Sequence, residues 1–107
     1  MKRLLKIGFV LALVSIVMAS CNKTEYGEVT FWQFSGSGYG VTTVTLNGSS
    51  SNITSEYSGT PSCGASGCAV FSNVETGTYT YSATDGSASW AGSVNITADQ
   101  CLTVELY

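Results

Sequence analysis

Four cysteines and seven carboxylates are the side chains in this 107-residue sequence that could support catalysis or bind a ligand. There is no histidine, so neither a Ser–His–Asp triad nor a Cys–His pair can form. Two carboxylates hydrolyse a glycosidic bond only when they face each other across a cleft. The acids are instead expected at turns, at strand ends and near the N-terminus, with Glu56 the main exception. The sequence therefore predicts no catalytic residues and no enzymatic activity.

The N-terminal segment has the layout of a bacterial secretory signal. Three basic residues, Lys2, Arg3 and Lys6, precede a mostly apolar run that contains no charge. This run is shorter than the roughly 20 residues that a transmembrane helix needs. It ends at two small residues followed by a thiol, Ala19-Ser20-Cys21.

This arrangement resembles the lipobox of bacterial lipoproteins. In that family the cysteine is acylated and the signal is cut immediately before it, which implies that Cys21 is the lipidated mature N-terminus. Several acyl chains, palmitate among them, then hold the protein at the membrane. Ordinary signal cleavage after Ala19, which would release a secreted protein, is the alternative. We expect a location in the cell envelope, at the outer membrane of a Gram-negative bacterium, and the orientation toward periplasm or exterior stays open.

Cleavage before Cys21 leaves 87 residues, enough for one small domain. The predicted organisation is a signal peptide over residues 1–20, a lipidated tether over residues 21–27 and a single domain over residues 28–107. This mature chain has one lysine against seven acids, a formal charge of −6. Such a chain repels nucleic acid and anionic headgroups, so its membrane contact is expected through the lipid alone.

The mature sequence is rich in Ser, Thr and Gly and lacks helical periodicity, which favours strands joined by tight turns. Asn47-Gly48 and Asp85-Gly86 are strong hairpin signals. Most of the expected strands alternate apolar with hydroxylated residues, so each has one face suited to a core. We therefore predict an all-β fold, a small seven-stranded antiparallel β-sandwich. The strands are expected at Glu28–Phe34, Val41–Asn47, Ile53–Tyr57, Cys68–Asn73, Thr78–Thr84, Ala88–Thr97 and Leu102–Tyr107.

The C-terminal half also resembles a known group of domains. Phe71, the Gly77-Thr78-Tyr79 turn and the alternating Leu102, Val104 and Leu106 are similar to the prealbumin-like sandwiches. That group includes the carboxypeptidase regulatory-like and PEGA-type domains of bacterial surface proteins. The resemblance implies a scaffold or binding role, without catalysis and without a cofactor.

If Cys21 carries lipid, three cysteines remain and one of them is left over. Cys63 and Cys68 enclose four small residues and could face each other across a hairpin, so a disulfide between them is the first prediction. Cys101 would then be the free thiol, and a Cys63–Cys101 bond is the competing pairing. No metal site is expected, because three cysteines without histidine are too few ligands at one end of the fold.

Trp32 and Phe34 alternate with Phe31 and Gln33, so either pair of positions could face outward. Exposed aromatic rings on a sandwich are a common surface for stacking sugars, and the alternative is that these rings fill the core. The sequence therefore predicts a non-catalytic, lipid-anchored envelope protein whose β-sandwich has a structural or protein-binding role. A glycan-binding accessory lipoprotein, with Trp32 and Phe34 as ligand contacts, is the alternative.

Overall fold

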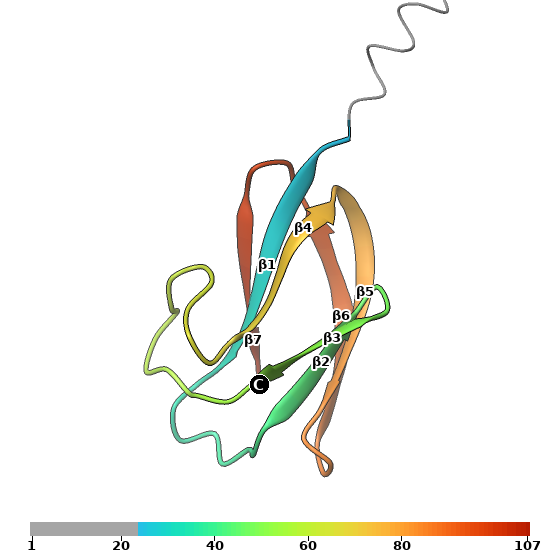
Figure 1. Cartoon of the computed structure of the whole chain (residues 1–107). Helices are drawn as coiled ribbons and strands as arrows, with labels where there is room; N and C mark the ends of the chain where they lie inside the picture. The colour runs from blue at the N-terminus through green and yellow to red at the C-terminus, as the bar shows by residue number, and fades with distance from the viewer. Residues whose placement is uncertain (1–23) are drawn as a thin grey trace, which may run out of the picture.

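The computed structural model describes residues 24–107, and in this range the chain is an all-β sandwich of seven strands in two sheets (Figure 1). The predicted fold class is thus confirmed. The predicted signal peptide and Cys21 lie outside the described residues. Within them, no helix is both long and apolar enough to span a bilayer. The strands are β1 Tyr26–Gln33, β2 Thr42–Leu46, β3 Ser49–Ile53, β4 Ala69–Glu75, β5 Gly77–Thr84, β6 Ser89–Ile96 and β7 Cys101–Leu106.

One sheet has the order β4-β1-β7 and the other β3-β2-β5-β6. Neighbouring strands are antiparallel with one exception, because β1 and β7 pair in parallel from Glu28↔Cys101 to Gln33↔Leu106. The chain leaves the four-stranded sheet after β6 and turns through residues 97–100 into the other sheet. It therefore arrives beside β1 at the end where β1 itself begins.

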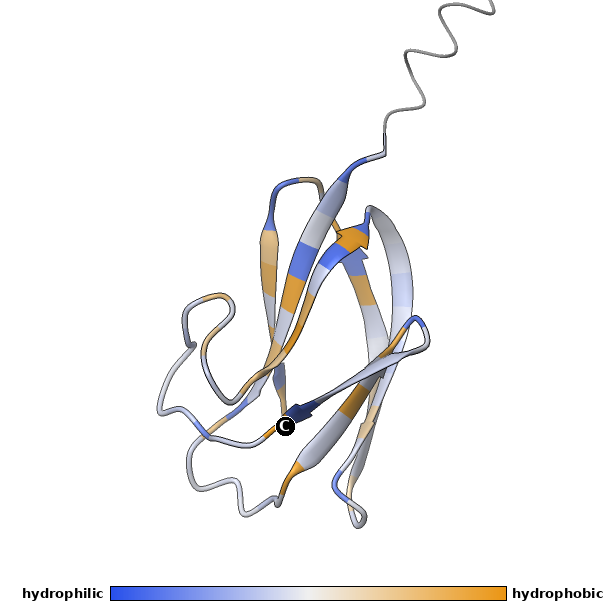
Figure 2. Cartoon of the chain, in the orientation of Figure 1, coloured by the Kyte–Doolittle hydropathy of each residue, from blue (hydrophilic) through white to orange (hydrophobic). Residues whose placement is uncertain are grey.

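Alternation along the strands builds the core between the sheets, and apolar bands interrupt the polar strands in Figure 2. Phe31 is fully buried at its centre, where its ring meets Phe71 edge-on at 5.8 Å and lies 4.8 Å from the ring of Tyr81. Burying one such side chain stabilises the fold by about 1.5–3 kcal/mol. The other buried members are Val29, Val44, Leu46, Ile53, Ala69, Ala83, Val94, Ile96 and Leu106.

The third strand lies earlier in the chain than the sequence predicts. Asn47 and Gly48 both adopt positive φ, 49° and 81°, and form a two-residue turn. β3 therefore starts at once with Leu46↔Ser49, whereas the prediction placed it at Ile53–Tyr57. The serines at the start of β3 have weak strand propensity, so their pairing with β2 is what holds them extended.

The first strand also begins earlier, at Tyr26 instead of residue 28. Gly27 is buried against the β6–β7 turn, so close that an added Cβ would overlap the carbonyl oxygen of Thr97. The next backbone N–H, that of Glu28, donates to the carbonyl of Gln100 at 3.0 Å. The end of the predicted tether is thus part of the folded domain.

The three-stranded sheet has an outer face, turned away from the core, and the connection over residues 54–68 lies over it (Figure 1). We call this connection the covering segment. Thr30 and Trp32 alternate with the core residues of β1, yet they are only 0% and 4% exposed. The N–H of Gly64 in the covering segment donates to the hydroxyl of Thr30 at 3.0 Å. A segment without regular structure therefore buries a second side of β1.

Candidate functional site

The disulfide joins Cys63 to Cys101, with 6.2 Å between their Cα atoms, so the predicted Cys63–Cys68 bond is wrong. Cys63 and Cys68 do not face each other across a hairpin, because no strand ends at Cys63. Cys63 lies within the covering segment, and Cys68 is the last residue of that segment. The covering segment takes Cys63 to the middle of β1, where its sulfur lies 3.7 Å from Thr30 Oγ1. The Cys101 sulfur lies 3.9 Å from the same hydroxyl oxygen. The bond therefore ties the covering segment to the start of β7.

Cys68 is the free cysteine of the described residues and is buried. It immediately precedes β4, and Ala69, the first residue of β4, pairs with Phe31, whereas Cys101 pairs with Glu28. Cys68 and Cys101 are thus separated along the strands. Burial raises the pKa of the Cys68 thiol by disfavouring its charged form. A protonated, buried thiol is a packing group and a poor nucleophile.

One cluster of metal-ligating atoms occurs within the described residues, formed by Glu28, Cys63 and Cys101. Their ligand atoms lie within 4.8 Å of one another. Both sulfurs are held in the disulfide, and a metal ion needs the free thiolate. The oxidised protein therefore offers a single carboxylate at this place.

The two predicted ligand-contact residues occupy the same face of β1 but differ in exposure. Trp32 is 4% exposed, so its ring is unavailable for stacking and the prediction of an aromatic platform there is wrong. The covering segment, whose path the local pattern of β1 does not reveal, explains this burial. Phe34 lies just beyond the strand and is 47% exposed.

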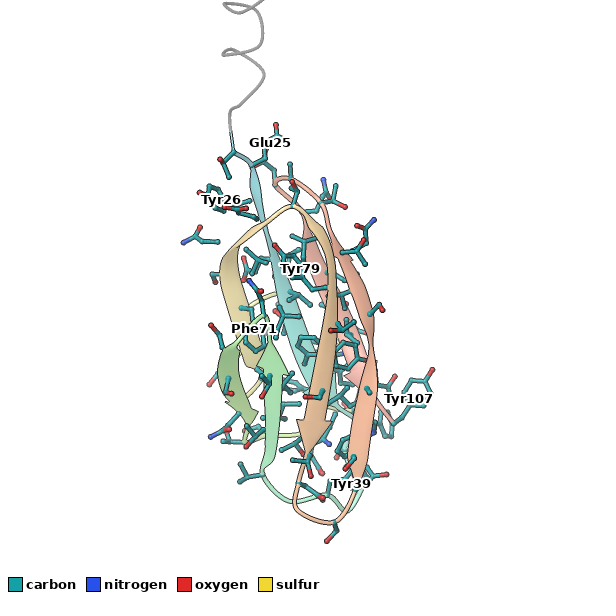
Figure 3. The ribbon with its side chains drawn as sticks, turned by 90° about the vertical axis from the view of Figure 1, so that its right-hand side faces the viewer. Glu25, Tyr26, Tyr39, Phe71, Tyr79 and Tyr107 are labelled. Carbon is teal, nitrogen blue, oxygen red and sulfur yellow. A yellow bond between two sulfur atoms is a disulfide. The ribbon has the colours of Figure 1, made fainter. Side chains whose placement is uncertain are left out.

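Exposed apolar residues gather at the end of the sandwich opposite to the point where the chain enters β1. We call this the distal end. Figure 3 shows Glu25 and Tyr26 at one end of the domain and Tyr39 and Tyr107 toward the other. Five large hydrophobic side chains are exposed in residues 24–107, and three belong to the distal end: Phe34 at 47%, Val41 at 57% and Tyr107 at 87%.

Three aromatic residues form a row across the distal end of the outer face. Phe34 makes a parallel bridge with Tyr57 on one side. On the other side the parallel register of β1 and β7 ends at Gln33↔Leu106, so the following residues, Phe34 and Tyr107, occupy neighbouring positions. Strands lie about 4.8 Å apart, so the backbones of the three residues lie side by side. We call this set the aromatic row.

A pocket of about 440 Å³ opens beside the aromatic row, at the distal edge between the two sheets. This volume lies within the range of about 300–1,000 Å³ that is common for ligand sites. We call it the mouth pocket. It is lined by Gln33, Tyr39, Gly40, Val41, Ile53, Thr54, Ser55 and Glu56.

Gln33 is the unusual member of this lining. It is 1% exposed, and its Nε2 is the sole buried side-chain polar atom without a hydrogen-bond partner in the described part of the chain. Its Oε1 lies 3.3 Å from the hydroxyl oxygen of Thr42, which also lies 3.2 Å from the carbonyl oxygen of Gly40. Buried polar groups are nearly always satisfied, so this exception calls for a physical account.

Glu56, the carboxylate that the sequence singled out, accepts hydrogen bonds from a neighbouring loop. It lies in the covering segment, outside the strands, and accepts the N–H of Gly36 at 3.1 Å and the hydroxyl of Ser37 at 2.9 Å. The carboxylate thereby holds the loop over residues 34–41 at the rim of the mouth pocket. Tyr39 from the same loop packs edge-on against Trp90 at 4.8 Å, which attaches the loop to β6.

The β5–β6 turn completes the distal end. The Asp85 carboxylate accepts the N–H groups of Ala88 at 2.7 Å and Ser87 at 2.8 Å. These bonds, that of Ala88 first, hold the pKa of Asp85 below its ordinary value because they favour the charged form. The role of this carboxylate is to stabilise the turn.

A second depression, of about 590 Å³, lies between the edge strands β3 and β4. Phe71 and Tyr79, both labelled in Figure 3, contribute to its walls together with the serines of β3. The Tyr79 hydroxyl donates to the carbonyl of Glu75 at 2.7 Å, so this polar group is satisfied within the fold.

Sequence reasoning missed Gln33, although a signal for it was present. In Phe31-Trp32-Gln33-Phe34, alternation places Gln33 on the same face as Phe31. An amide at a core-facing position is a conflict between pattern and chemistry, and such conflicts are expected at functional or strained positions.

The comparisons with known proteins add no relative: no protein-family model matches the chain, and no curated protein sequence is significantly similar to it.

Proposed function

We propose that this protein is a non-catalytic, lipid-anchored module of the cell envelope that presents its distal end to a structural or protein partner. The observation that supports this is the polarity of the domain. The chain enters β1 at one end, and Phe34, Val41 and Tyr107 are exposed at the other. A strand of eight residues spans roughly 26 Å, so a partner at the distal end stands clear of the anchored end.

The anchor is proposed at Cys21, with the signal peptide of a bacterial lipoprotein before it and the outer membrane of a Gram-negative bacterium as its location. β1 begins at Tyr26, so very few residues separate the lipid from the folded domain. The short spacer keeps the proximal end near the membrane and leaves the distal end as the accessible one. The seven-stranded sandwich is compatible with the prealbumin-like resemblance, which implies a scaffold or binding role.

The anchor is tested by Cys21→Ala in cells fed an alkyne analogue of palmitate. We expect the variant to lose acyl labelling and to leave the membrane fraction, while wild-type protein retains both. A variant that still carries label, or one that changes the disulfide content by mass, would contradict the assignment of Cys21 as the lipidated residue.

The distal contact is tested by photocrosslinking on intact cells. A benzophenone amino acid at Phe34 is expected to capture an envelope partner. The same group at Leu102, which is 37% exposed at the proximal end, is the matched control and is expected to capture none. Equal capture from both positions would contradict a distal interaction surface.

A second candidate function is glycan binding by an accessory surface lipoprotein, and the aromatic row favours it. Aromatic side chains on neighbouring backbone positions offer flat surfaces on which sugar rings stack through their apolar faces. The test is Phe34→Ala on a glycan array, where loss of binding is expected. Trp32→Ala is unsuitable for this purpose, because Trp32 is buried and its removal would destabilise the fold.

A further inference from the structure

We propose that the mouth pocket is a subsite for one residue of a neutral saccharide, with the Gln33 side-chain amide as its polar anchor. This inference rests on the second candidate function and names the group that would distinguish one sugar from another. Gln33 and Glu56 line the pocket, and their chain neighbours Phe34 and Tyr57 belong to the aromatic row on the outer face. A chain of sugars that passes over the distal edge of the sheet could therefore contact both.

The side chains and backbone around Gln33 do not satisfy both polar atoms of its amide. The Thr42 hydroxyl has a single hydrogen and faces two carbonyl oxygens, those of Gln33 and Gly40. If it donates to Gln33 Oε1, then Nε2 has no partner. If it donates to Gly40, the amide can rotate so that Nε2 donates to Thr42, and Oε1 then has no partner. Either orientation leaves one polar atom without a hydrogen bond.

The residue that carries this atom borders the mouth pocket. Gln33 is at least nine-tenths buried and is one of the residues that line the mouth pocket. A buried, unsatisfied amide opposes folding, and an apolar side chain of the same length would remove that penalty. A ligand that donates to or accepts from the amide would supply the missing bond.

The charges around the pocket select the class of ligand. Residues 24–107 contain no lysine or arginine, so nothing in the described domain attracts an anion. The Glu56 carboxylate is already engaged by Gly36 and Ser37, which leaves it weak as a partner for a cation. Sugar hydroxyls both donate and accept, so they suit the amide in either orientation, and the ring of Tyr39 offers an apolar wall. A neutral, polyhydroxylated ligand fits these conditions.

A ligand reaches the Gln33 amide only if the rim of the pocket shifts. Nε2 is buried, and the loop over residues 34–41, which Glu56 holds through Gly36 and Ser37, forms part of that rim. Gly36, Gly38 and Gly40 alternate along this loop, and the space around each is open. Gly36 and Gly38 adopt φ values of +86° and +81°, which glycine adopts without strain. Closure of the loop on the ligand would then bury the new hydrogen bond.

The test uses the full-length lipoprotein in detergent micelles and an array of neutral oligosaccharides, including cello-, laminari-, manno- and chito-oligosaccharides, with oligogalacturonates as acidic counterparts. The best neutral ligand is then titrated by NMR. We expect the side-chain amide resonances of Gln33 to shift on addition of that ligand. This readout uses wild-type protein and does not depend on the folding of any variant.

The Gln33→Met variant is expected to weaken binding at least tenfold while its thermal unfolding midpoint stays equal or rises. Gln100→Met, at the exposed β6–β7 turn of the proximal end, is the matched control and should bind as wild type. Absence of binding across the neutral array, preference for the acidic sugars, unmoved Gln33 resonances, or binding unaffected in Gln33→Met would each overturn the proposal. In those cases capture of a partner through Phe34 would still support the proposed display function.

Discussion

Removal of the Cys63–Cys101 disulfide should cost this domain about 4 kcal/mol of unfolding free energy. The bond joins residues 38 positions apart, and the chain-entropy relation gives this value for a ring of that length. The Cys63–Cys68 pairing would close a ring of about six residues, for which the same relation gives about 2 kcal/mol. The two pairings therefore predict different losses of unfolding free energy. They also predict that different cysteine substitutions cause the loss.

The measurement is thermal or urea unfolding of a Cys63→Ser/Cys101→Ser double variant beside wild-type protein. For a domain of this size a loss of about 4 kcal/mol lowers the Tm by about 15–30 °C. Cys68→Ala is the matched control, since it removes a buried thiol that takes no part in the bond. It is expected to cost about 1 kcal/mol or less.

Peptide mapping without reduction provides the independent check. A linked pair of fragments that contain Cys63 and Cys101 is expected, together with a Cys68 that alkylates slowly until the protein is unfolded. The reasoning would be refuted if the map linked Cys63 to Cys68, or if Cys68→Ala destabilised the domain as much as the double variant.

Two further predictions concern backbone contacts at opposite ends of the domain. Asp85 has a lowered pKa in the folded state, so its stabilising effect is present above its ordinary pKa of about 3.9 and is lost as the pH falls through the folded value. NMR titration of the Asp85 carboxyl should show this lowered pKa, and Asp85→Asn should abolish the corresponding pH dependence of stability; an ordinary pKa would contradict the turn bonds. Gly27→Ala should destabilise by about 1–3 kcal/mol because its Cβ would overlap the carbonyl of Thr97, whereas Gly59→Ala, which has open space, should be neutral in the same unfolding assay.

The features that could be predicted from the sequence are those with local causes. The all-β class follows from residues that favour strands and from alternation along each strand, which depends only on neighbours in the chain. The Asn47-Gly48 turn was recognised because glycine and asparagine tolerate the positive φ that a tight hairpin needs. The start of β3 was misplaced because its serines are extended through pairing with β2, which propensity does not register.

The candidate site was only partly predictable. Phe34 was one of two candidate ligand contacts on a face that could point either way, and it is exposed. Trp32 has the same face and the same local pattern, and yet it is buried, because the covering segment crosses the outer face above it. The difference between these two positions arises from a segment more than twenty residues away in the chain.

The sequence by itself thus determined the all-β class, the approximate position of most strands, the side chains that share a face and the residue types that were present for chemistry. The tertiary structure decided which strands share a sheet, that β1 and β7 run in parallel, that Cys63 bonds to Cys101 and that the Gln33 amide lies unsatisfied beside a pocket. Each of these depends on contacts between distant parts of the chain. Local propensity and alternation act over a few residues, so they cannot specify which distant surfaces meet.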